Sequence, residues 1–367
     1  MKILQICSAR QFGGGERHVA DLSNSLADTG YEVYAAINPG SPLDKNLVSL
    51  PRVNIREVRM RNSIDILAGR ELASIVRDLN IDIIHAHVAR DYPLAAYASA
   101  RTGNTPFILT RHVLFPINKI HRRILARASR IIAVSNGVRR SLIAQKILAP
   151  ERIVTIYNGV DTGRFETALG PKTAASADKK DRLLVGMIGH IASIKGQEDF
   201  IRAAAIIVRQ RPDVDFVIVG EDKSRRGENR EAVEDLVAKL NGEKRIRFAG
   251  WREDVRQILG DLDVFVSPSR SEPFGLVIIE AMTAGIPVVT TASEGALEII
   301  DDGKTGKIVP IRDPESLADS IVSLLDDPAE RSRIAAAALK IIRQRFSLER
   351  MVVATGNLYA EVISERS

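Results

Sequence analysis

The chain has 367 residues, a net charge of +6 and a single cysteine, Cys7. This length suits two α/β domains that each bury a core, and one cysteine excludes a disulfide within the chain and favours a reducing compartment. No apolar run reaches about 18 uncharged residues and the N-terminus lacks a signal-peptide pattern, so we expect a cytoplasmic protein that does not span a membrane.

Short apolar runs alternate with amphipathic stretches along the whole chain, a pattern that predicts parallel strands joined by crossover helices. We expect strands in the first half at residues 2–7, 32–37, 53–58, 82–87, 107–110, 130–135 and 152–157. A second series is expected at residues 183–189, 214–220, 245–250, 263–268, 287–290 and 306–309. Helical stretches close the chain at roughly 314–326, 328–344 and 347–363.

The two series of strands are separated by residues 168–181, which are rich in Ala, Ser, Lys and Gly and lack periodicity. We interpret this segment as an exposed linker between Rossmann-like domains at 1–167 and 182–346. Each domain is expected to be a doubly wound parallel sheet. Such sheets bind ligands at the carboxyl ends of their strands, so two of them facing a cleft predict a site with residues from both halves.

The charge is unevenly distributed, because residues 101–150 contain ten Lys or Arg and no Asp or Glu. A basic face of this kind attracts anionic lipid or an acidic substrate. Nucleic acid is a weaker choice, since aromatic residues that stack on bases are nearly absent there. A merely solvated basic helix is the alternative.

A glycine run, Gly13 to Gly15, follows the first predicted strand. Placed in the turn before a helix, these glycines let a ligand approach backbone N–H groups, although a plain tight turn also explains them.

Three histidines end two neighbouring predicted strands: His85 and His87 on one, and His112 on the next. They can ligate a metal, but no Asp or Glu lies between Asp91 and Glu151 to complete a site, so we expect no metal there. A structural role is expected for His85 and a position in the cleft for His112.

In the second half, Lys195-Gly196 begins a predicted helix, where an ammonium and the helix dipole combine into an anion site. Gly275 begins another helix, with Glu272 in the loop before it and Glu280 one turn further in. A buried carboxylate needs donors, and a ribose diol supplies two of them. We therefore expect ribose at Glu280, a diphosphate at the helix start and a sugar at Glu272.

In combination, these motifs resemble the family-4 retaining glycosyltransferases of the GT-B fold, over nearly the whole chain. The motifs are the E-P-F-G-x-x-x-x-E segment at 272–280, the Gly-rich loop with Glu16, and the segments at 110–112, 158–161, 194–196 and 293–309. The resemblance implies transfer of a sugar from a nucleotide sugar with retention of configuration and no obligatory metal. It also implies that the closing helix, at 347–367, returns to the N-terminal domain.

The resemblance also assigns residues. It implies catalytic roles for His112, Lys195 and Glu272. Donor contacts are implied for Gly14, Gly15, His190, Lys195, Phe274, Gly275, Leu276 and Glu280, and Glu16, His87 and Arg111 are expected on the acceptor side.

One departure from the family pattern concerns the diphosphate site. The family usually has Gly-Arg five residues before the lysine, and here the pair is Gly189-His190. Either His190 contacts the phosphates, or another cation such as Arg111 or Arg270 replaces the arginine.

We expect a hexosyltransferase-type enzyme acting on a lipid-linked or anionic glycan in lipopolysaccharide or surface-polysaccharide assembly. The expected donor is a UDP-sugar, although the side chains near Gly220 and Trp251 fit other bases too. No further cofactor and no nucleic acid partner are expected, and segment 101–150 favours peripheral binding to the inner face of the cytoplasmic membrane. A nucleotide-sugar epimerase of the same fold and a non-catalytic nucleotide-sugar binding module stay open as alternatives.

Overall fold

The computed structural model describes residues 1–117, 119–169 and 182–366. The chain divides into a first unit, Met1–Gly159 with Leu348–Ser367, and a second unit, Val160–Ser347. Of the predicted linker 168–181, residues 168 and 169 end helix α6, and residues 170–181 lie outside the described residues.

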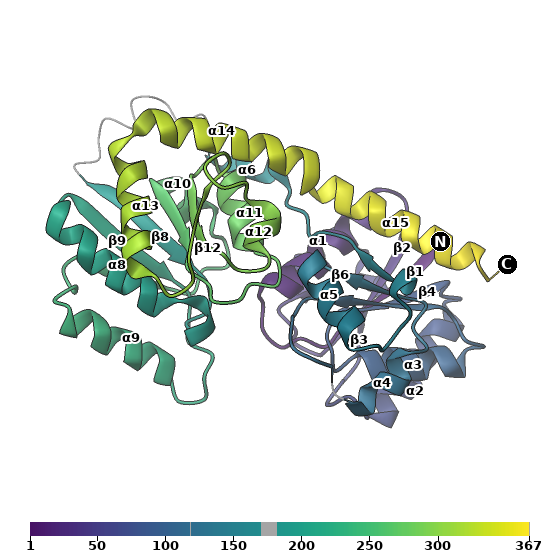
Figure 1. Ribbon diagram of the computed structural model, residues 1–367. Helices are drawn as coiled ribbons and strands as arrows, with labels where there is room; N and C mark the ends of the chain where they lie inside the picture. The colour runs from purple at the N-terminus through teal and green to yellow at the C-terminus, as the bar shows by residue number, and fades with distance from the viewer. Residues whose placement is uncertain (118, 170–181, 367) are drawn as a thin grey trace. The chain divides into compact units, whose positions relative to one another are not determined.

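The first unit is built on a seven-stranded parallel sheet with the order β3-β2-β1-β4-β5-β6-β7 (Figure 1). Its strands are β1 (Lys2–Cys7), β2 (Glu32–Ile37), β3 (Ile55–Glu57), β4 (Ile83–Ala86), β5 (Phe107–Arg111), β6 (Arg130–Ala133) and β7 (Ile153–Thr155). Its helices are α1 (Gly14–Asp28), α2 (Ile66–Asp78), α3 (Tyr92–Arg101), α4 (Lys119–Leu125), α5 (Asn136–Ala144) and α15 (Leu348–Ser364), with short 3-10 turns at Asp44–Asn46, Arg52–Asn54 and Pro150–Arg152.

The second unit is built on a six-stranded parallel sheet with the order β10-β9-β8-β11-β12-β13. Its strands are β8 (Leu183–Ile188), β9 (Val214–Val219), β10 (Ile246–Gly250), β11 (Val264–Ser267), β12 (Val288–Thr291) and β13 (Lys307–Val309). Its helices are α6 (Thr162–Leu169), α8 (Gln197–Gln210), α9 (Glu228–Lys239), α10 (Arg256–Asp261), α11 (Leu276–Thr283), α12 (Ala296–Ile299), α13 (Pro314–Asp326) and α14 (Pro328–Arg345), with a 3-10 turn at Ser193–Lys195.

Both sheets have the strand order of doubly wound dinucleotide-binding folds, which confirms the predicted fold class and every predicted strand. The direction of winding reverses between β1 and β4 in the first unit and between β8 and β11 in the second. Ligands bind such sheets beside these reversal points, at the carboxyl ends of the strands. We therefore expect ligand-binding residues in the loops after these four strands.

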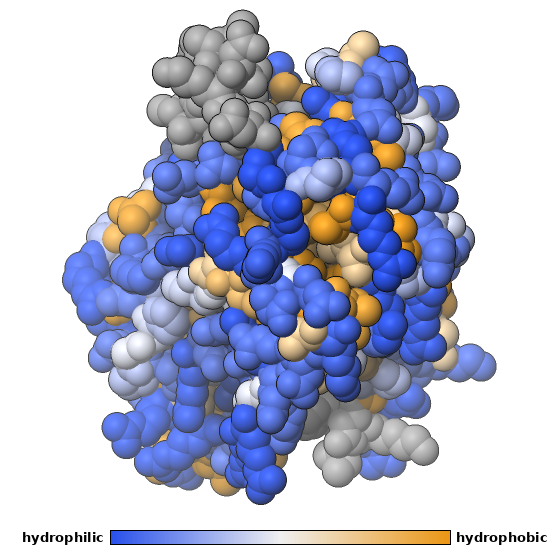
Figure 2. Space-filling view, turned by 90° about the vertical axis from the view of Figure 1, so that its left-hand side faces the viewer, coloured by the Kyte–Doolittle hydropathy of each residue, from blue (hydrophilic) through white to orange (hydrophobic). Residues whose placement is uncertain are grey.

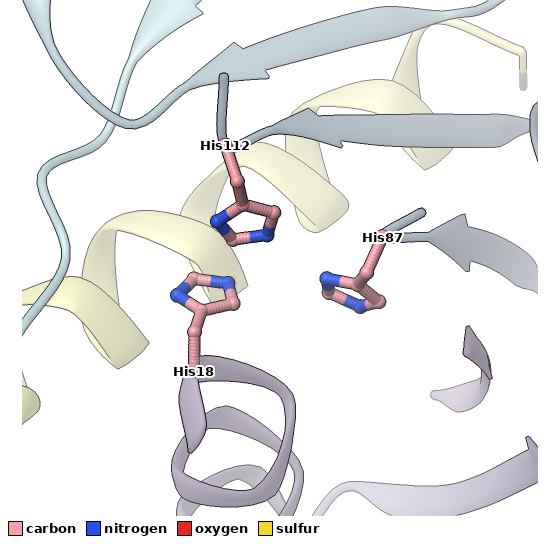
Figure 3. A group of neighbouring side chains, drawn as sticks. All are labelled: His18, His87 and His112. Atoms are coloured by element: carbon pink, nitrogen blue, oxygen red, sulfur yellow. The ribbon is translucent and has the colours of Figure 1, made fainter. Parts of the chain in front are cut away.

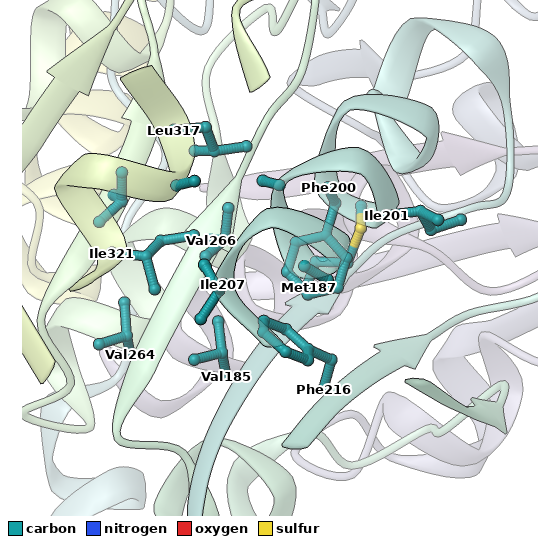
Figure 4. Close-up of a cluster of buried hydrophobic side chains, with 14 of the residues drawn as sticks. Val185, Met187, Phe200, Ile201, Ile207, Phe216, Val264, Val266, Leu317 and Ile321 are labelled. Atoms are coloured by element: carbon teal, nitrogen blue, oxygen red, sulfur yellow. The ribbon is translucent and has the colours of Figure 1, made fainter. Parts of the chain in front are cut away.

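The core of the second unit explains why its strands are nearly continuous apolar runs. Helices cover both faces of the sheet, so residues of β8, β9 and β11 are buried against α8 and α13 (Figure 4). On α8, Phe200, Ala203, Ala204 and Ile207 follow helical spacing and are fully buried. This packing holds the loops at the carboxyl ends of β8 and β11 on a rigid base.

Helix α15 belongs to the first unit, although 188 residues separate it in sequence from Gly159. Its buried residues Met351, Leu358 and Tyr359 share one apolar cluster with Leu22 and Leu26 of α1. Tyr359 is fully buried, which makes α15 part of the core of this unit.

The protein surface is mainly polar where Figure 2 shows it, on the side where α8 and α9 lie in Figure 1. Hydrophobic side chains are visible between the polar ones near the centre of that face. Within the described part of the chain, no helix combines the length and the apolar character needed to cross a bilayer.

Candidate functional site

In the second unit, two charged side chains meet at the carboxyl ends of the neighbouring strands β8 and β11. Lys195 ends the 3-10 turn after β8, and Glu272 lies in the loop after β11. Lys195 Nζ donates to Glu272 Oε2 at 2.6 Å, and the two side chains are 28% and 15% exposed. Ser269 Oγ donates to the same oxygen at 3.3 Å. The residues expected at the diphosphate and at the sugar thus form one partly buried ion pair.

Two helix N-termini lie beside this pair in sequence, and neither has a side-chain cap. Gly196 precedes α8 with φ +73° and Gly275 precedes α11 with φ +111°. A Cβ on Gly196 would lie 2.0 Å from the carbonyl oxygen of Pro268, so only glycine fits there. The first N–H groups of both helices have no intrahelical partner and can donate to an anion.

Three further residues predicted to contact the donor lie in α11 or just before it: Phe274, Leu276 and Glu280. Phe274 is 2% exposed and its ring packs on Phe346 with centroids 5.8 Å apart, so its side chain belongs to the core. Leu276 is the first residue of α11 and contributes a backbone N–H at the helix start. Glu280 is half-buried one turn further along the helix. Of these three residues, only Glu280 can present a side-chain acceptor to a ligand.

His190 follows β8 and is partly buried. Burial and the nearby charges of Lys223 and Lys195 lower its pKa to about 4, so its imidazole is neutral at pH 7. Its backbone carbonyl accepts a hydrogen bond from Gln197 Nε2 at 2.8 Å, which ties the loop to the start of α8.

The two arginines considered as substitutes for the family arginine are both engaged elsewhere. The guanidinium of Arg270 pairs with Glu198 at 3.2 Å and with Asp199 at 3.5 Å. Arg111 is 4% exposed and donates to the backbone carbonyl of Phe115 in its own unit. Neither guanidinium is free for a diphosphate, and the burial of Arg111 also disfavours its predicted place on the acceptor side.

In the first unit, the glycine run lies partly inside a helix. Gly14 and Gly15 are the first residues of α1, so the prediction that all three glycines form the turn is wrong for these two. A Cβ on Gly15 would meet no atom within 4 Å, so the surrounding protein does not itself require glycine there. Glu16 lies in the first turn of α1, where a carboxylate complements the helix dipole.

Three histidines gather at the carboxyl ends of β4 and β5, and one of them was missed by the sequence analysis. His18 comes from α1, His87 follows β4 and His112 follows β5, and the three rings face a common space (Figure 3). Ring centroids of His18 and His112 are 4.7 Å apart. Both nitrogens of His18, Nδ1 of His87 and Nε2 of His112 are buried and have no hydrogen-bond partner among the residues that the structure describes.

His85, His87 and His112 do not together offer free ring nitrogens to a ligand, because both ring nitrogens of His85 are already bonded. Its Nδ1 lies 2.6 Å from Tyr359 Oη and its Nε2 lies 2.7 Å from Thr110 Oγ1. His85 therefore has the structural role expected for it.

The histidines that can act together are His18, His87 and His112, whose ring nitrogens lie within 4.8 Å of one another. Nitrogens bound to one tetrahedral zinc ion are roughly 3.4 Å apart, given Zn–N distances of about 2.0–2.1 Å. A metal would require the rings to move together. Burial lowers the pKa of His18 to about 4 and lowers those of His87 and His112 well below the ordinary value, so all three are neutral and suited to sugar hydroxyls.

A buried polar network contacts this histidine cluster through His87. Gln5 of β1 accepts a hydrogen bond through Oε1 from His87 Nε2 at 2.7 Å, and its amide nitrogen donates to Tyr359 Oη at 3.4 Å. Tyr359 in turn contacts His85, which pairs with Gln5 in the register of β1 and β4. The orientation of His87 thus depends on residues of both β1 and α15.

Asp91 is a second residue that the sequence analysis left unassigned. It is fully buried before α3, where its Oδ2 accepts from the backbone N–H of Ser8 at 2.8 Å; its Oδ1 has no partner within the described part of the chain. Burial raises its pKa to about 7. Asp91 therefore ties the end of β1 to α3 beside the point where the winding reverses.

Both units match models of known protein families. Residues 12–164 match the model described as Glycosyltransferase Family 4, and residues 172–341 match the model described as Glycosyl transferases group 1. The lipopolysaccharide core biosynthesis glycosyltransferase LpsE of Rhizobium meliloti (strain 1021) is 30% identical over 344 residues, which cover 92% of this chain and 93% of the relative. The N-acetyl-alpha-D-glucosaminyl L-malate synthase of Bacillus anthracis is 26% identical and is matched over 96% of this chain and 95% of its own length.

Among solved structures, Anabaena Alr3699/HepE in complex with UDP and glucose superposes with a TM-score of 0.85, at 23% identity, over 98% of this chain and 99% of that one. This likeness bears on the fold, and it agrees with the two doubly wound sheets of the GT-B architecture. Together with the matched family models and the relative at 30% identity, it shows that the chain belongs to the GT-B glycosyltransferases of the group 1 and family 4 type.

Proposed function

We propose that the protein transfers a sugar from a UDP-sugar to a hydroxyl of a lipid-linked or anionic glycan acceptor, with retention of anomeric configuration and without a metal ion. The observation that carries this proposal is the ion pair of Lys195 and Glu272 beside the uncapped starts of α8 and α11. This arrangement offers cationic and N–H groups to a diphosphate and a carboxylate to sugar hydroxyls.

The chemistry follows from charge development at the leaving group. As the bond between the sugar and the diphosphate lengthens, negative charge grows on the diphosphate, and Lys195 and the helix N–H groups stabilise it. These groups take the role that a metal ion has elsewhere. The acceptor hydroxyl attacks from the face that the diphosphate leaves, which preserves the configuration, and its proton passes to the departing diphosphate oxygen. Glu272 orients the donor sugar, and Glu280 accepts hydrogen bonds from the ribose.

The first unit supplies the acceptor-side groups of the proposal. Unpartnered, neutral nitrogens of His18, His87 and His112 can bond hydroxyl groups without adding charge. An anionic acceptor is supported by the names of two relatives, which refer to lipopolysaccharide core biosynthesis and to L-malate. A place on the inner face of the cytoplasmic membrane is supported by the exposed Arg123, Arg127 and Arg140.

The test begins with the donor. Calorimetric titration with UDP, GDP and ADP identifies the base, and incubation with a panel of the matching nucleotide sugars follows, with and without EDTA. Release of nucleoside diphosphate that requires a glycan acceptor and survives EDTA supports the proposal, and NMR of the product reports its anomeric configuration. Conversion of the donor sugar without acceptor would instead identify an epimerase, and binding without any turnover would identify a binding module.

A further inference from the structure

A hollow of about 520 Å³ opens at the carboxyl ends of β1, β2 and β3 in the first unit, and three arginines line it. Arg10 follows β1, and Arg59 and Arg61 follow β3, while the loop after β2 contributes the floor. All three side chains are exposed. Arg59 and Arg61 flank the fully buried Met60. Both arginines line the same hollow, one on either side of Met60 in sequence.

The segments that carry these arginines are fastened to one another by a buried amide. Asn38, 5% exposed, donates through Nδ2 to the carbonyl oxygen of Ser8 at 2.6 Å and accepts through Oδ1 from the N–H of Met60 at 2.9 Å. Ser41 Oγ adds a bond to the carbonyl oxygen of Ala9 at 3.1 Å. The backbone beside Arg10 and the backbone between Arg59 and Arg61 are therefore held around the same hollow.

The charge in this hollow is largely uncompensated. Across residues 1–117, 119–169 and 182–366, no carboxylate lies within ion-pair distance of the guanidinium of Arg10, Arg59 or Arg61. Asp65 accepts from the backbone N–H of Arg61 at 3.2 Å but does not line the hollow. The residues that line the hollow thus carry three positive charges and no negative one.

We propose that Arg10, Arg59 and Arg61 form an anion subsite that binds a phosphate group carried by the sugar acceptor. Three guanidinium groups suit a phosphate monoester, which carries about −1.5 to −2 at neutral pH. Guanidinium groups bind phosphate oxygens with paired, directional hydrogen bonds. The inference rests on the proposed function only in naming the phosphate as part of an acceptor, since the anion site itself is independent of the donor groups around Lys195.

Binding of glucose 6-phosphate, measured by calorimetry at low salt in the presence of saturating UDP, tests the subsite, because UDP occupies the other anion site. We expect glucose 6-phosphate to bind, glucuronate to bind more weakly and glucose not to bind measurably. Arg59→Gln and Arg61→Gln should each weaken glucose 6-phosphate by about tenfold or more, the effect of losing a hydrogen bond to a charged group. The matched control is Arg140→Gln, an exposed arginine of the same unit on α5, which should change the affinity less than about twofold.

The titrations with glucose 6-phosphate and with UDP separate this inference from the proposed function. Glucose 6-phosphate affinity that is unchanged in the Arg59 and Arg61 variants, or equally reduced in the Arg140 variant, overturns the subsite whatever UDP does. Failure of UDP to bind overturns the proposed donor site, and the anion titration without UDP then still decides the subsite. UDP affinity in each arginine variant reports whether the fold is intact.

Discussion

Lys195 Nζ and Glu272 Oε2 lie 2.6 Å apart in the second unit, so without donor each charge has the other as its partner. A diphosphate that binds Lys195 must therefore compete with Glu272. Because that competition disappears when the carboxylate becomes an amide, Glu272→Gln should leave the affinity for UDP unchanged or increase it. Its turnover should fall, because the donor sugar loses a charged hydrogen-bond acceptor.

Substitution of Glu280 should have the opposite effect on the affinity for UDP. If its carboxylate accepts from the ribose, Glu280→Gln should weaken UDP binding by about 1–3 kcal/mol. Titration of both variants with UDP compares them directly. An order in which Glu272→Gln weakens UDP more than Glu280→Gln does contradicts the assignment of ribose to Glu280.

His190 should make donor binding depend on pH. Its pKa is about 4 in the free protein, and a diphosphate in contact with the ring would raise that value by favouring the imidazolium. Affinity for UDP should then be greatest near pH 6 and decline toward pH 8.5, with uptake of protons on binding at the lower pH. The ionisation of UDP itself affects the native protein and the His190→Arg variant equally. His190→Arg should remove the rest of the decline in affinity. Parallel profiles would mean that His190 does not touch the phosphates.

Asp91 should make stability depend on pH. Its pKa is raised from 3.8 to about 7, so the folded state holds the proton more tightly than the unfolded state. The stability gained from protonation is full below about pH 4 and is lost as the pH rises to about 7. Between pH 5 and pH 8 this loss is about 3 kcal/mol. Urea unfolding of Asp91→Asn should lack that loss, and an equal slope with pH in both proteins would show that Asp91 is not its source.

Tyr359 should stabilise the first unit through its hydroxyl. Tyr359→Phe leaves a buried ring nitrogen of His85 without its partner at 2.6 Å, at an expected cost of about 1–3 kcal/mol in the free energy of unfolding. Tyr97→Phe is the control, since no hydrogen bond of its hydroxyl is found in the described residues and it should cost less than about 0.5 kcal/mol. Equal urea midpoints for the two variants would contradict the role of the network.

Membrane binding should depend on the exposed part of segment 101–150. Arg130 is largely buried and pairs with Glu361 at 2.6 Å, so fewer cations are available than the sequence suggests. The double change Arg123→Gln and Arg127→Gln should reduce binding to anionic vesicles by about 1 kcal/mol per residue, in a salt-dependent way. The same double change at Arg225 and Arg226, which are exposed in the second unit, should have little effect. Equal partitioning of the native protein onto neutral vesicles would exclude an electrostatic mechanism.

The fold could be predicted from the sequence because each strand of a parallel sheet is a short apolar run of its own. Helix boundaries could also be predicted where a capping residue marks them. An example is Asp313, whose side chain accepts from Ser316 N at the start of α13. The second-unit pair of Lys195 and Glu272 was also foreseeable as two residues at strand ends, although their direct contact was not, because it depends on side-chain conformation across 77 residues of sequence.

The histidine cluster was only half predictable. Period-two alternation brings His85 and His87 to one side of β4, but it cannot reveal that Tyr359, 274 residues away, takes up a nitrogen of His85. His18 was missed because it lies on the buried face of α1, where apolar neighbours such as Val19 and Leu22 make a histidine look like core. A signal was present, since His18 lies within one helical turn of the glycine run.

The position of α15 has a consequence for how the chain folds during synthesis. The first 159 residues leave the ribosome before Tyr359 exists, so Gln5 and His85 lack their hydrogen bonds to Tyr359 until residues 348–364 follow. At about 5–20 residues per second, that delay is roughly 10–40 seconds, during which the second unit can complete its own core. Nascent chains arrested before α15 should therefore be protease-sensitive in residues 1–159 while residues 182–345 are already protected.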